Sequence, residues 1–229
     1  MLQKFLKWKK VFEKVKSKRM PTRKIWDHTI DLKEMFKLQK ERIYSLSKNK
    51  REEIQNFVND QLRKRYIRLS KFPQTLLVFF ISKKDRSKRI VMDYCNLNKQ
   101  TVKNNYLLLL IIDLIDNIES KRVFTKMNLQ WGFNNVRIKK GNKWKGAFTI
   151  HVGLFEPIVM FFGITNSPAT FQTIINKILK DLVNKGKITV CIDDVLIGTR
   201  TEKGYNKIVE EVLRRLEKND LYIKPEKCI

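Results

Sequence analysis

Cysteine and histidine are scarce in this chain. Its three cysteines, Cys95, Cys191 and Cys228, lie far apart and form no CxxC pair, and its two histidines are His28 and His151. This usage excludes a disulfide-rich scaffold and a zinc site built from clustered histidines. No Ser-His-Asp arrangement can be argued either. Free thiols in a reducing compartment fit best.

Glycine and long apolar runs are also rare. The eight glycines are scattered, so the sequence has no glycine-rich phosphate loop, and it shows no repeats or low-complexity tracts. The longest apolar run, residues 107–112, ends at Asp113. A bilayer-spanning helix needs about 20 apolar residues, so the sequence predicts no membrane span.

Acidic residues are few relative to basic ones. The 229 residues include 49 Lys and Arg against 23 Asp and Glu, which gives a net charge of +26. Such an excess favours a polyanionic partner, most commonly nucleic acid, and the alternative is a solvated basic surface. The hydrophobic content of 42% is typical of one large or two small folded domains.

Helical and strand periodicities are mixed along the chain. Residues 1–25 are predicted to be a basic leader or linker, because residues 1–20 hold eight Lys or Arg and one acid. Apolar spacing predicts helices over residues 47–66, 107–118, 167–186 and 205–216. Alternating apolar residues predict strands over residues 76–81, 89–94 and 123–129 and hairpins over 147–163 and 188–199. Strands mixed with helices on one face imply an α+β fold.

Two of the predicted helices carry start signals. Ser47 is expected to cap a helix whose apolar face is formed by Ile54, Phe57, Val58 and Leu62. In the same way, Ser167 followed by Pro168 is expected to cap the helix that Gly186 stops.

Two adjacent aspartates, Asp193 and Asp194, mark the tip of the Ile188–Thr199 hairpin (ITVCIDDVLIGT). Neighbouring carboxylates with half-buried flanks are costly unless a cation or a hydrogen-bond network neutralises them. Carboxylate oxygens suit Mg²⁺ or Mn²⁺. The sequence therefore predicts a divalent-cation site, with an exposed Asp-Asp turn as the alternative.

A basic tip joins the two strands of an earlier hairpin. It contains Lys83, Lys84, Arg86 and Lys88 within residues 82–88. Basic tips usually face water, but near a metal-binding aspartate pair they could hold a triphosphate.

Five blocks carry a resemblance to a known family: KKDRSKRIVMDYCNLNKQTVKNNY, VFTKMNLQWGFNNVRI, FEPIVMFFGITNSPATFQ, CIDDVLIGT and LYIKPEKC. Their order and spacing resemble the reverse transcriptase, an RNA-directed DNA polymerase, of gypsy-class long-terminal-repeat retrotransposons. The likeness runs from Trp26 to the C-terminus.

The resemblance implies a right-hand polymerase with an antiparallel palm sheet. It places fingers at residues 26–102 and 136–166 and palm at residues 103–135 and 167–229. It also implies template-directed DNA synthesis from dNTPs on RNA or DNA, with two Mg²⁺ (or Mn²⁺) ions.

The resemblance also implies roles for individual residues. Asp193 and Asp194 match the metal-binding pair, and Lys83 and Arg89 match residues that hold the incoming triphosphate. Phe133 matches the aromatic residue that excludes a 2′-OH. Further matches are nucleotide contacts at Phe162 and Gly163, template and primer contacts at Ser167, Pro168, Phe171 and Gln172, and a proton donor at Lys227, with Lys224 as second choice.

Asn128 departs from the family pattern, which has a third aspartate there. In-line phosphoryl transfer on two cations needs several carboxylates at one spot. An amide keeps a carbonyl ligand but loses the negative charge, which should cost about 3 kcal/mol, or about 100-fold in rate. We therefore expect a polymerase fold with little or no activity.

Other positions also depart from the pattern, as expected of a mutated copy. The substituted positions are Arg65 and Arg86 for Gly, Leu69, Leu107 and Leu109 for Pro, Phe72 for Ser, Cys95 for Arg, Asn142 for Asp and Lys143 for an acid. Nearly all are reachable by single C-to-T or G-to-A transitions, which suggests cytosine deamination and means that part of the net charge reflects mutation. Arg65 and Arg86 are expected at positive φ, each costing about 1 kcal/mol relative to Gly.

Three functions compete at this point: a crippled reverse transcriptase domain, a non-catalytic nucleic-acid-binding remnant, and a basic structural protein whose Asp-Asp turn is incidental. The resemblance implies as partners a template-primer, dNTPs and the RNase H and integrase of a Pol polyprotein, and no membrane. The thumb that the family places after the palm is expected to be missing, so template-primer would be held poorly. The expected location is the cytoplasm, within a virus-like particle in an intact element, or the nucleus, without secretion.

Overall fold

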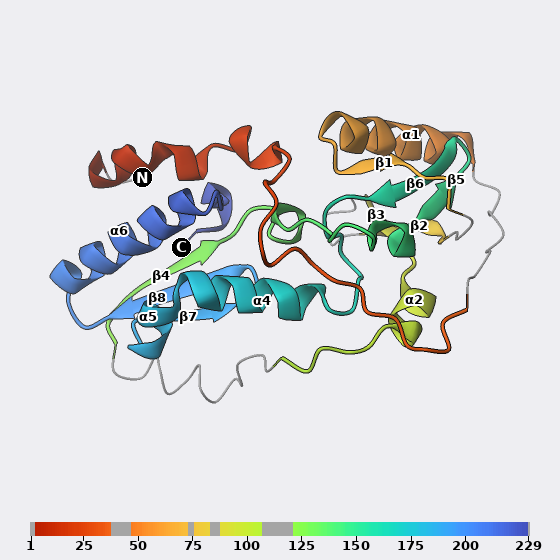
Figure 1. Cartoon of the computed structure of the whole chain (residues 1–229). Coiled ribbons are helices and arrows are strands. Elements are labelled where there is room, and N and C mark those ends of the chain that lie inside the picture. Colours follow the sequence, from red (N-terminus) through yellow and green to blue (C-terminus); the bar gives the residue numbers. More distant parts are fainter. Residues whose placement is uncertain (1–2, 38–46, 73–75, 83–87, 107–120, 229) are drawn as a thin grey trace. The chain divides into compact units, whose positions relative to one another are not determined.

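The computed structural model describes residues 3–37, 47–72, 76–82, 88–106 and 121–228. The chain divides into two compact units, each built from separate stretches of sequence. Unit 1 comprises Met1–Arg19, Asn105–Gly132 and Pro168–Ile229, and unit 2 comprises Met20–Asn104 and Phe133–Ser167. Figure 1 labels their elements. The assignment of these units to palm and fingers stays a prediction.

The centre of unit 1 is a three-stranded antiparallel sheet in the order β4–β8–β7. Its strands are β4 (Val123–Asn128), β7 (Ile188–Cys191) and β8 (Asp194–Thr199). Both predicted elements, the strand at 123–129 and the hairpin at 188–199, are therefore confirmed. The register pairs Val123 with Thr199 at one end of the sheet and Asn128 with Asp194 at the other.

Helix α6 (Glu202–Lys218) confirms the last predicted helix and packs on β8. Its buried stripe at helical spacing consists of Ile208, Val209, Val212, Leu213 and Leu216. The helix begins at Thr201, whose hydroxyl accepts the Gly204 N–H at 3.3 Å.

The basic N-terminal segment, predicted to be a leader or linker, packs onto unit 1. It contains η1 (Gln3–Phe12) and η2 (Lys16–Lys18), and η1 contacts α6. Phe5 and Val11 are buried there, and the Val11 carbonyl accepts the Ile223 N–H at 2.9 Å. The apolar residues of η1 account for this packing, although lysine is the most frequent residue in the segment.

The predicted helix over residues 167–186 is two helices, α4 (Ser167–Ile178) and α5 (Lys180–Asn184). The break falls at Leu179 (φ −106°, ψ 11°). Gly186 (φ 60°) ends α5, as predicted. Ser167 does not cap α4: it is the first helical residue, and its buried Oγ has no hydrogen-bond partner among the described residues.

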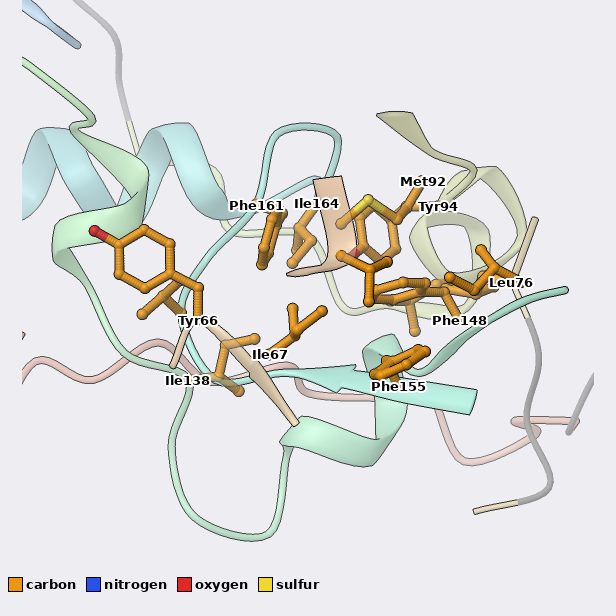
Figure 2. Packing of buried hydrophobic residues seen from close by; sticks show 14 of the residues in the cluster. Tyr66, Ile67, Leu76, Met92, Tyr94, Ile138, Phe148, Phe155, Phe161 and Ile164 are labelled. Carbon is orange, nitrogen blue, oxygen red and sulfur yellow. The ribbon is translucent and has the colours of Figure 1, made fainter. Parts of the chain in front are cut away.

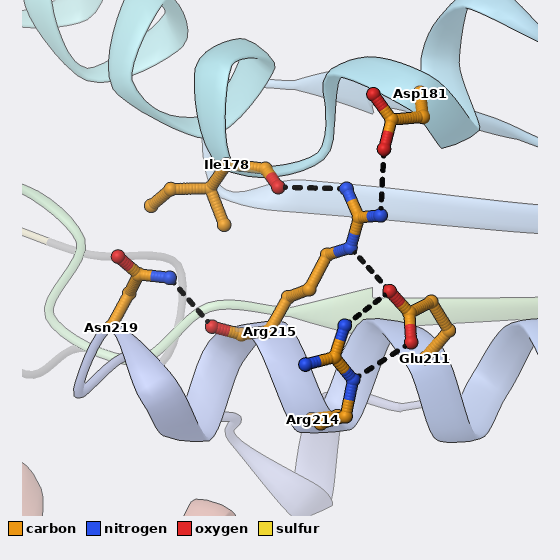
Figure 3. Close-up of polar contacts among 6 residues, drawn as sticks. All are labelled: Ile178, Asp181, Glu211, Arg214, Arg215 and Asn219. Atoms are coloured by element: carbon orange, nitrogen blue, oxygen red, sulfur yellow. Dashed lines mark hydrogen bonds and ion pairs between the residues drawn. The ribbon is translucent and has the colours of Figure 1, made fainter.

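An arginine on α6 ties three helices of unit 1 together (Figure 3). Arg215 donates to the Ile178 carbonyl at the end of α4 (3.1 Å), to Asp181 in α5 (2.9 Å) and to Glu211 one turn earlier (2.6 Å). Glu211 also accepts two hydrogen bonds from Arg214. These bonds, those from Arg214 first, lower the pKa of Glu211 to about 2.

Unit 2 contains the sheet β1–β6–β5 and the hairpin β2–β3. The strands are β1 (Ile67–Leu69), β2 (Val78–Ser82), β3 (Lys88–Met92), β5 (Phe148–Ile150) and β6 (Gly153–Pro157). Its helices are α1 (Lys48–Arg63), α2 (Cys95–Gln100), η3 (Phe133–Asn135) and η4 (Lys143–Gly146), while η5 (Pro225–Lys227) belongs to unit 1. Both hairpins predicted in this unit are confirmed.

Aromatic and branched side chains from all parts of unit 2 meet in one core (Figure 2). Helix α1 contributes Ile54 and Val58, with Phe57 partly buried. Leu62 was predicted on this face but is exposed, and Gln61 is buried instead. The buried stripe advances by four and then three residues, from Ile54 to Val58 to Gln61, and so bypasses Leu62.

The two ends of α1 differ in how well the sequence predicts them. Ser47 occupies the N-cap position, but its side chain makes no capping hydrogen bond. At the other end, Arg65 has φ 60°, as predicted. The Arg65 and Tyr66 N–H groups donate to Leu62 and Gln61, which is the Schellman pattern that normally uses glycine at Arg65's position.

Several predictions lie outside the described residues: the helix over 107–118, with Leu107 and Leu109, and the basic tip at 83–87, with Lys83 and Arg86. Among the described helices, none combines the length and apolar character needed to cross a bilayer.

Candidate active site

The β7–β8 turn places the two aspartates at one end of the unit 1 sheet. Ile192 and Asp193 form the turn, and Asp194 begins β8 opposite Cys191. Ile192 has φ 53°, a left-handed conformation that is unfavourable for a β-branched residue. Such strain persists only where surrounding contacts hold it.

Gln172 of α4 provides these contacts. Its Oε1 accepts the Ile192 N–H at 2.7 Å, and its Nε2 donates to the Val190 carbonyl at 3.0 Å. The side chain is fully buried. Gln172 was predicted to contact template or primer, and in the structure it braces the turn that carries Asp193.

The end of β4 meets this turn. The Leu129 N–H donates to the Asp193 carbonyl at 2.6 Å, and the Asn128 Nδ2 donates to Asp194 Oδ1 at 2.8 Å. The predicted meeting of the 123–129 strand end with the hairpin tip is therefore confirmed. A shared cation at this place stays a prediction.

Asp193 lies in a confined space. Burial first, and then the negative charge of Asp194, raise its pKa to about 6, although Lys227 opposes the shift. Its buried Oδ1 has no hydrogen-bond partner among the described residues. A Cβ at Gly132 would lie 2.1 Å from that oxygen and 2.9 Å from the Phe171 ring, so only glycine leaves room for the carboxylate.

Asp194 is half exposed and already has donors on both oxygens. Lys126 Nζ lies 3.0 Å from Oδ2, and the Asn128 amide occupies Oδ1. Lys126 and Asn128 are two residues apart on β4 and share one face of the sheet. That spacing is a sequence signal that could have identified Lys126 as a neighbour of the site.

The donor set fits a two-cation centre poorly. The described residues contain no group of three His, Cys, Asp or Glu side chains placed to hold a metal ion. Asn128 presents its NH₂ group to Asp194 and adds no charge. Lys126 brings a positive charge to Asp194 Oδ2, and Asp193 Oδ1 is a buried carboxylate oxygen without a hydrogen-bond partner among the described residues.

The C-terminal segment borders the same strand end. The Lys224 N–H donates to the Asn128 carbonyl at 2.8 Å, and the Gln130 N–H donates to the Tyr222 carbonyl at 2.7 Å. η5 contacts β4 and carries Lys227, whose charge acts on Asp193. The structure therefore brings Lys227 near the aspartate pair.

The remaining predicted residues are distributed over both units. Phe133 and Phe162 lie together in unit 2, with ring centroids 4.9 Å apart at 57°. Next to them, Gly163 has φ 101° and its carbonyl accepts a hydrogen bond from Asn98 at 2.7 Å. Arg89 is described by its backbone, which pairs with Ile81 in the β2–β3 hairpin. Ser167 and Pro168 begin α4, and Phe171 is buried in unit 1.

Unit 1 thus combines an antiparallel sheet, an aspartate turn at one end of it and flanking helices, and sequence comparison identifies the family. A profile described as reverse transcriptase (RNA-dependent DNA polymerase) matches residues 81–229, and the chain belongs to this family. The Transposon Tf2-3 and Tf2-7 polyproteins of Schizosaccharomyces pombe are each 36% identical to it over 187 residues, which cover 82% of this chain and 14% of each polyprotein. The resemblance to gypsy-class retrotransposons is thus confirmed.

Solved structures show the same fold. A foamy viral protease-reverse transcriptase in complex with an RNA/DNA hybrid matches 99% of this chain and 30% of that chain, with a TM-score of 0.85 and 22% identity. The corresponding complex with double-stranded DNA matches 98% of this chain and 39% of that chain, with the same TM-score and identity. The predicted combination of helices and antiparallel sheet is therefore that of a reverse transcriptase polymerase fold.

Proposed function

We propose that this chain is the polymerase portion of a retrotransposon polyprotein in which nucleotidyl transfer is impaired. The ancestral reaction is template-directed DNA synthesis from dNTPs on an RNA or DNA template. The observation that carries the proposal is the 2.8 Å hydrogen bond from the Asn128 amide to Asp194. It indicates an aspartate pair that has lost its third carboxylate and gained a neutral donor in its place.

Charge supports the same conclusion. Reverse transcriptases use divalent cations, and two are expected in the intact family. Here the Lys126 ammonium already neutralises Asp194. The loss of the carboxylate at position 128 and the presence of the Lys126 ammonium both weaken the attraction of the site for a metal ion. We therefore expect nucleotidyl transfer to be at least about 100-fold slower than with aspartate at position 128.

The other residues keep the roles that their positions favour. Gln172 holds the turn, and Gly132 leaves room for Asp193. In unit 2, Phe133 is proposed to exclude a ribose 2′-OH and Phe162 and Gly163 to border the nucleotide. Lys83 and Arg89 are proposed to hold the triphosphate, and Lys227 is proposed as a proton donor to pyrophosphate.

The second candidate function is nucleic-acid binding without catalysis. A net charge of +26 favours it, as does an aspartate whose oxygens are satisfied without a cation. The foamy viral relatives were solved with an RNA/DNA hybrid and with double-stranded DNA, which makes template-primer the natural probe.

Primer extension tests the first function. The chain, Asn128→Asp and Asn128→Ala are each assayed on one RNA template-primer with Mg²⁺ or Mn²⁺, and binding of the same template-primer is measured by anisotropy. Asn128→Asp should extend the primer at least about 100-fold faster than the chain itself. Asn128→Ala removes the amide without adding charge and should gain nothing.

Each outcome assigns a function. Restored synthesis in Asn128→Asp supports an impaired polymerase. Equal binding by all three proteins, with no product from Asn128→Asp, supports the nucleic-acid-binding function. Full activity in the unaltered chain would show that Asn128 does not impair transfer.

A further inference from the structure

A basic pocket lies in unit 1, at the end of β8 opposite Asp194. An open pocket of about 330 Å³ is lined there by the side chains of Lys121, Lys187, Arg200 and Lys207. Gly198 and Thr201 also line it. The rise of β8 places this end of the strand about 17 Å from the aspartate pair. The pocket is therefore separate from the candidate active site.

The four cations converge from different elements without acidic partners. Lys121 precedes β4, Lys187 precedes β7, Arg200 follows β8 and Lys207 lies on α6. In the described part of the chain, none of them has a carboxylate within ion-pair distance, and no acidic residue lines the pocket. The acidic side chains of the described residues thus leave the positive charge in the pocket uncompensated.

The acids nearest along α6 are committed elsewhere. Glu210 pairs with Lys7 at 3.1 Å, and Glu211 accepts hydrogen bonds from Arg214 and Arg215 (Figure 3). Glu202 is an acid in the first turn of the same helix, but it does not line the pocket.

Lys121 is held in place rather than extended into water. Its Nζ donates to the Gly186 carbonyl at 2.5 Å, and burial lowers the pKa of its ammonium group. Its stem lies against Gly198, where a Cβ would approach Lys121 Cδ to 2.6 Å. Glycine at this position therefore allows the lysine to lie across β8. A bound anion would favour the charged ammonium that burial disfavours.

The donors match a ligand with several negative charges. Arginine binds phosphate oxygens through two parallel hydrogen bonds, and lysines act as point charges. The Thr201 hydroxyl accepts the Gly204 N–H and can still donate its own hydrogen. Four cations exceed what a single carboxylate would neutralise, and the volume suits two or three phosphate groups.

We propose that this pocket is a binding site for the phosphate groups of an oligophosphate or of a nucleic-acid backbone. Three further exposed cations, Arg122, Lys185 and Lys203, are each adjacent in the chain to a residue that lines the pocket, so we expect the positive surface to continue beyond it. A backbone strand would use this continuation, whereas a free oligophosphate would use the pocket alone.

Calorimetric titration with inorganic triphosphate tests the site. The triple variant Lys187→Gln, Arg200→Gln, Lys207→Gln removes three pocket charges. The triple variant Lys14→Gln, Lys18→Gln, Lys218→Gln removes three exposed charges of unit 1 that do not line it. The first should weaken binding by about tenfold or more and the second by less than about twofold. No binding by the unaltered chain, or equal weakening in both variants, overturns the proposal.

Gly198→Ala tests the geometry without changing any charge. Its Cβ should displace Lys121 and weaken triphosphate binding several-fold, and urea unfolding shows whether the variant remains folded. If it does not fold, the charge variants still decide.

A ten-residue oligothymidylate, titrated in the same way, identifies the source of the phosphate. Weaker binding of both probes to the pocket variant assigns the site to a nucleic-acid backbone. Weaker binding of triphosphate alone assigns it to a free oligophosphate.

Discussion

The electrostatics of the aspartate pair depend on single atoms of the neighbouring side chains. Exchange of a carboxylate oxygen for an amide nitrogen at Asn128 turns repulsion toward Asp194 into a hydrogen bond. Lys126 on the same strand face adds a cation to the other oxygen. Asp193 retains an unpartnered oxygen in the described structure, with a pKa raised to about 6 mainly by burial. On the proposed function, this aspartate pair should attract metal ions less strongly than a site with aspartate at position 128.

A buried histidine makes stability depend on pH. Burial lowers the pKa of His28 from 6.5 to about 4, although Asp31 opposes the shift. The folded chain therefore binds fewer protons than the unfolded chain between these values, and stability falls as the pH drops through them. Through His28, the free energy of unfolding of the unaltered chain should fall by about 2 kcal/mol between pH 7 and pH 5. His28→Asn should not show this part of the fall.

Urea unfolding at both pH values measures this difference. His151→Asn, at an exposed position, is the control and should follow the unaltered chain. If the His28 variant and the unaltered chain lose the same free energy of unfolding between pH 7 and pH 5, His28 is not the source of this pH dependence.

Arg65 stores backbone strain at the end of α1. With φ 60° in a Schellman motif, it occupies a position that glycine adopts without steric cost. Arg65→Gly should raise the free energy of unfolding by about 1 kcal/mol. Asn56→Gly, at an exposed position inside the same helix, should lower it by about 0.3 kcal/mol. A destabilised Arg65→Gly protein would mean that the arginine side chain outweighs the strain.

At the scale of elements, the β7–β8 hairpin depends on a helix. Its turn contains Ile192 in a left-handed conformation, and the hydrogen bonds that support it come from Gln172 of α4. The strand pairing fixes the register of the aspartates, and the helix fixes the shape of the turn. Loss of the helix contact should therefore loosen the turn more than the strands.

Gln172→Met keeps the length of the side chain and removes its two hydrogen bonds to the turn, together with a third to Asn176 Oδ1. It leaves the Ile192 N–H and the Val190 carbonyl without these partners, which should lower the free energy of unfolding by about 2 kcal/mol. Urea unfolding measures this loss, and amide exchange at Ile192 should accelerate beyond the global change. Gln55→Met, at a partly exposed position of α1 where it removes one hydrogen bond to Asn59, should have a smaller effect. If the amide exchange rate at Ile192 is unchanged in Gln172→Met, the turn does not need the Gln172 hydrogen bonds.

At the scale of the whole chain, two units are built from interleaved sequence and share an excess of positive charge. Ion pairs of the described residues use few of the basic side chains, and several pairs are exposed, where each contributes little. The remaining charge is available to polyanions. Part of it reflects mutation if the deamination hypothesis holds, and counting transitions against transversions in related coding DNA decides that.

Nucleic-acid binding should therefore depend steeply on salt. Between 50 and 200 mM salt, the dissociation constant for a template-primer should rise by about 1000-fold if six or more phosphates are contacted. Asn128→Asp should shift the slope of log K against log salt by less than about one. Fluorescence anisotropy across the salt series measures both. If the dissociation constant does not change with salt, the net positive charge of the chain does not contribute to nucleic-acid binding.

The sequence by itself determined the elements that local physics controls. Alternating apolar residues defined β4 and the β7–β8 hairpin, and Gly186 and Arg65 marked helix ends through left-handed backbone positions. The ordered blocks also identified the family and placed Asn128 beside the aspartates.

Only the tertiary structure decided what faces Asp194. Lys126 and Asn128 act on it because β4 pairs with β8 in one register, and Gln172 of α4 lies within hydrogen-bond distance of the turn that precedes it. The same holds for the burial of Gln61 in place of Leu62, the break at Leu179 and the convergence of four cations on one pocket. Each depends on contacts between residues distant in the chain, which periodicity and spacing do not encode.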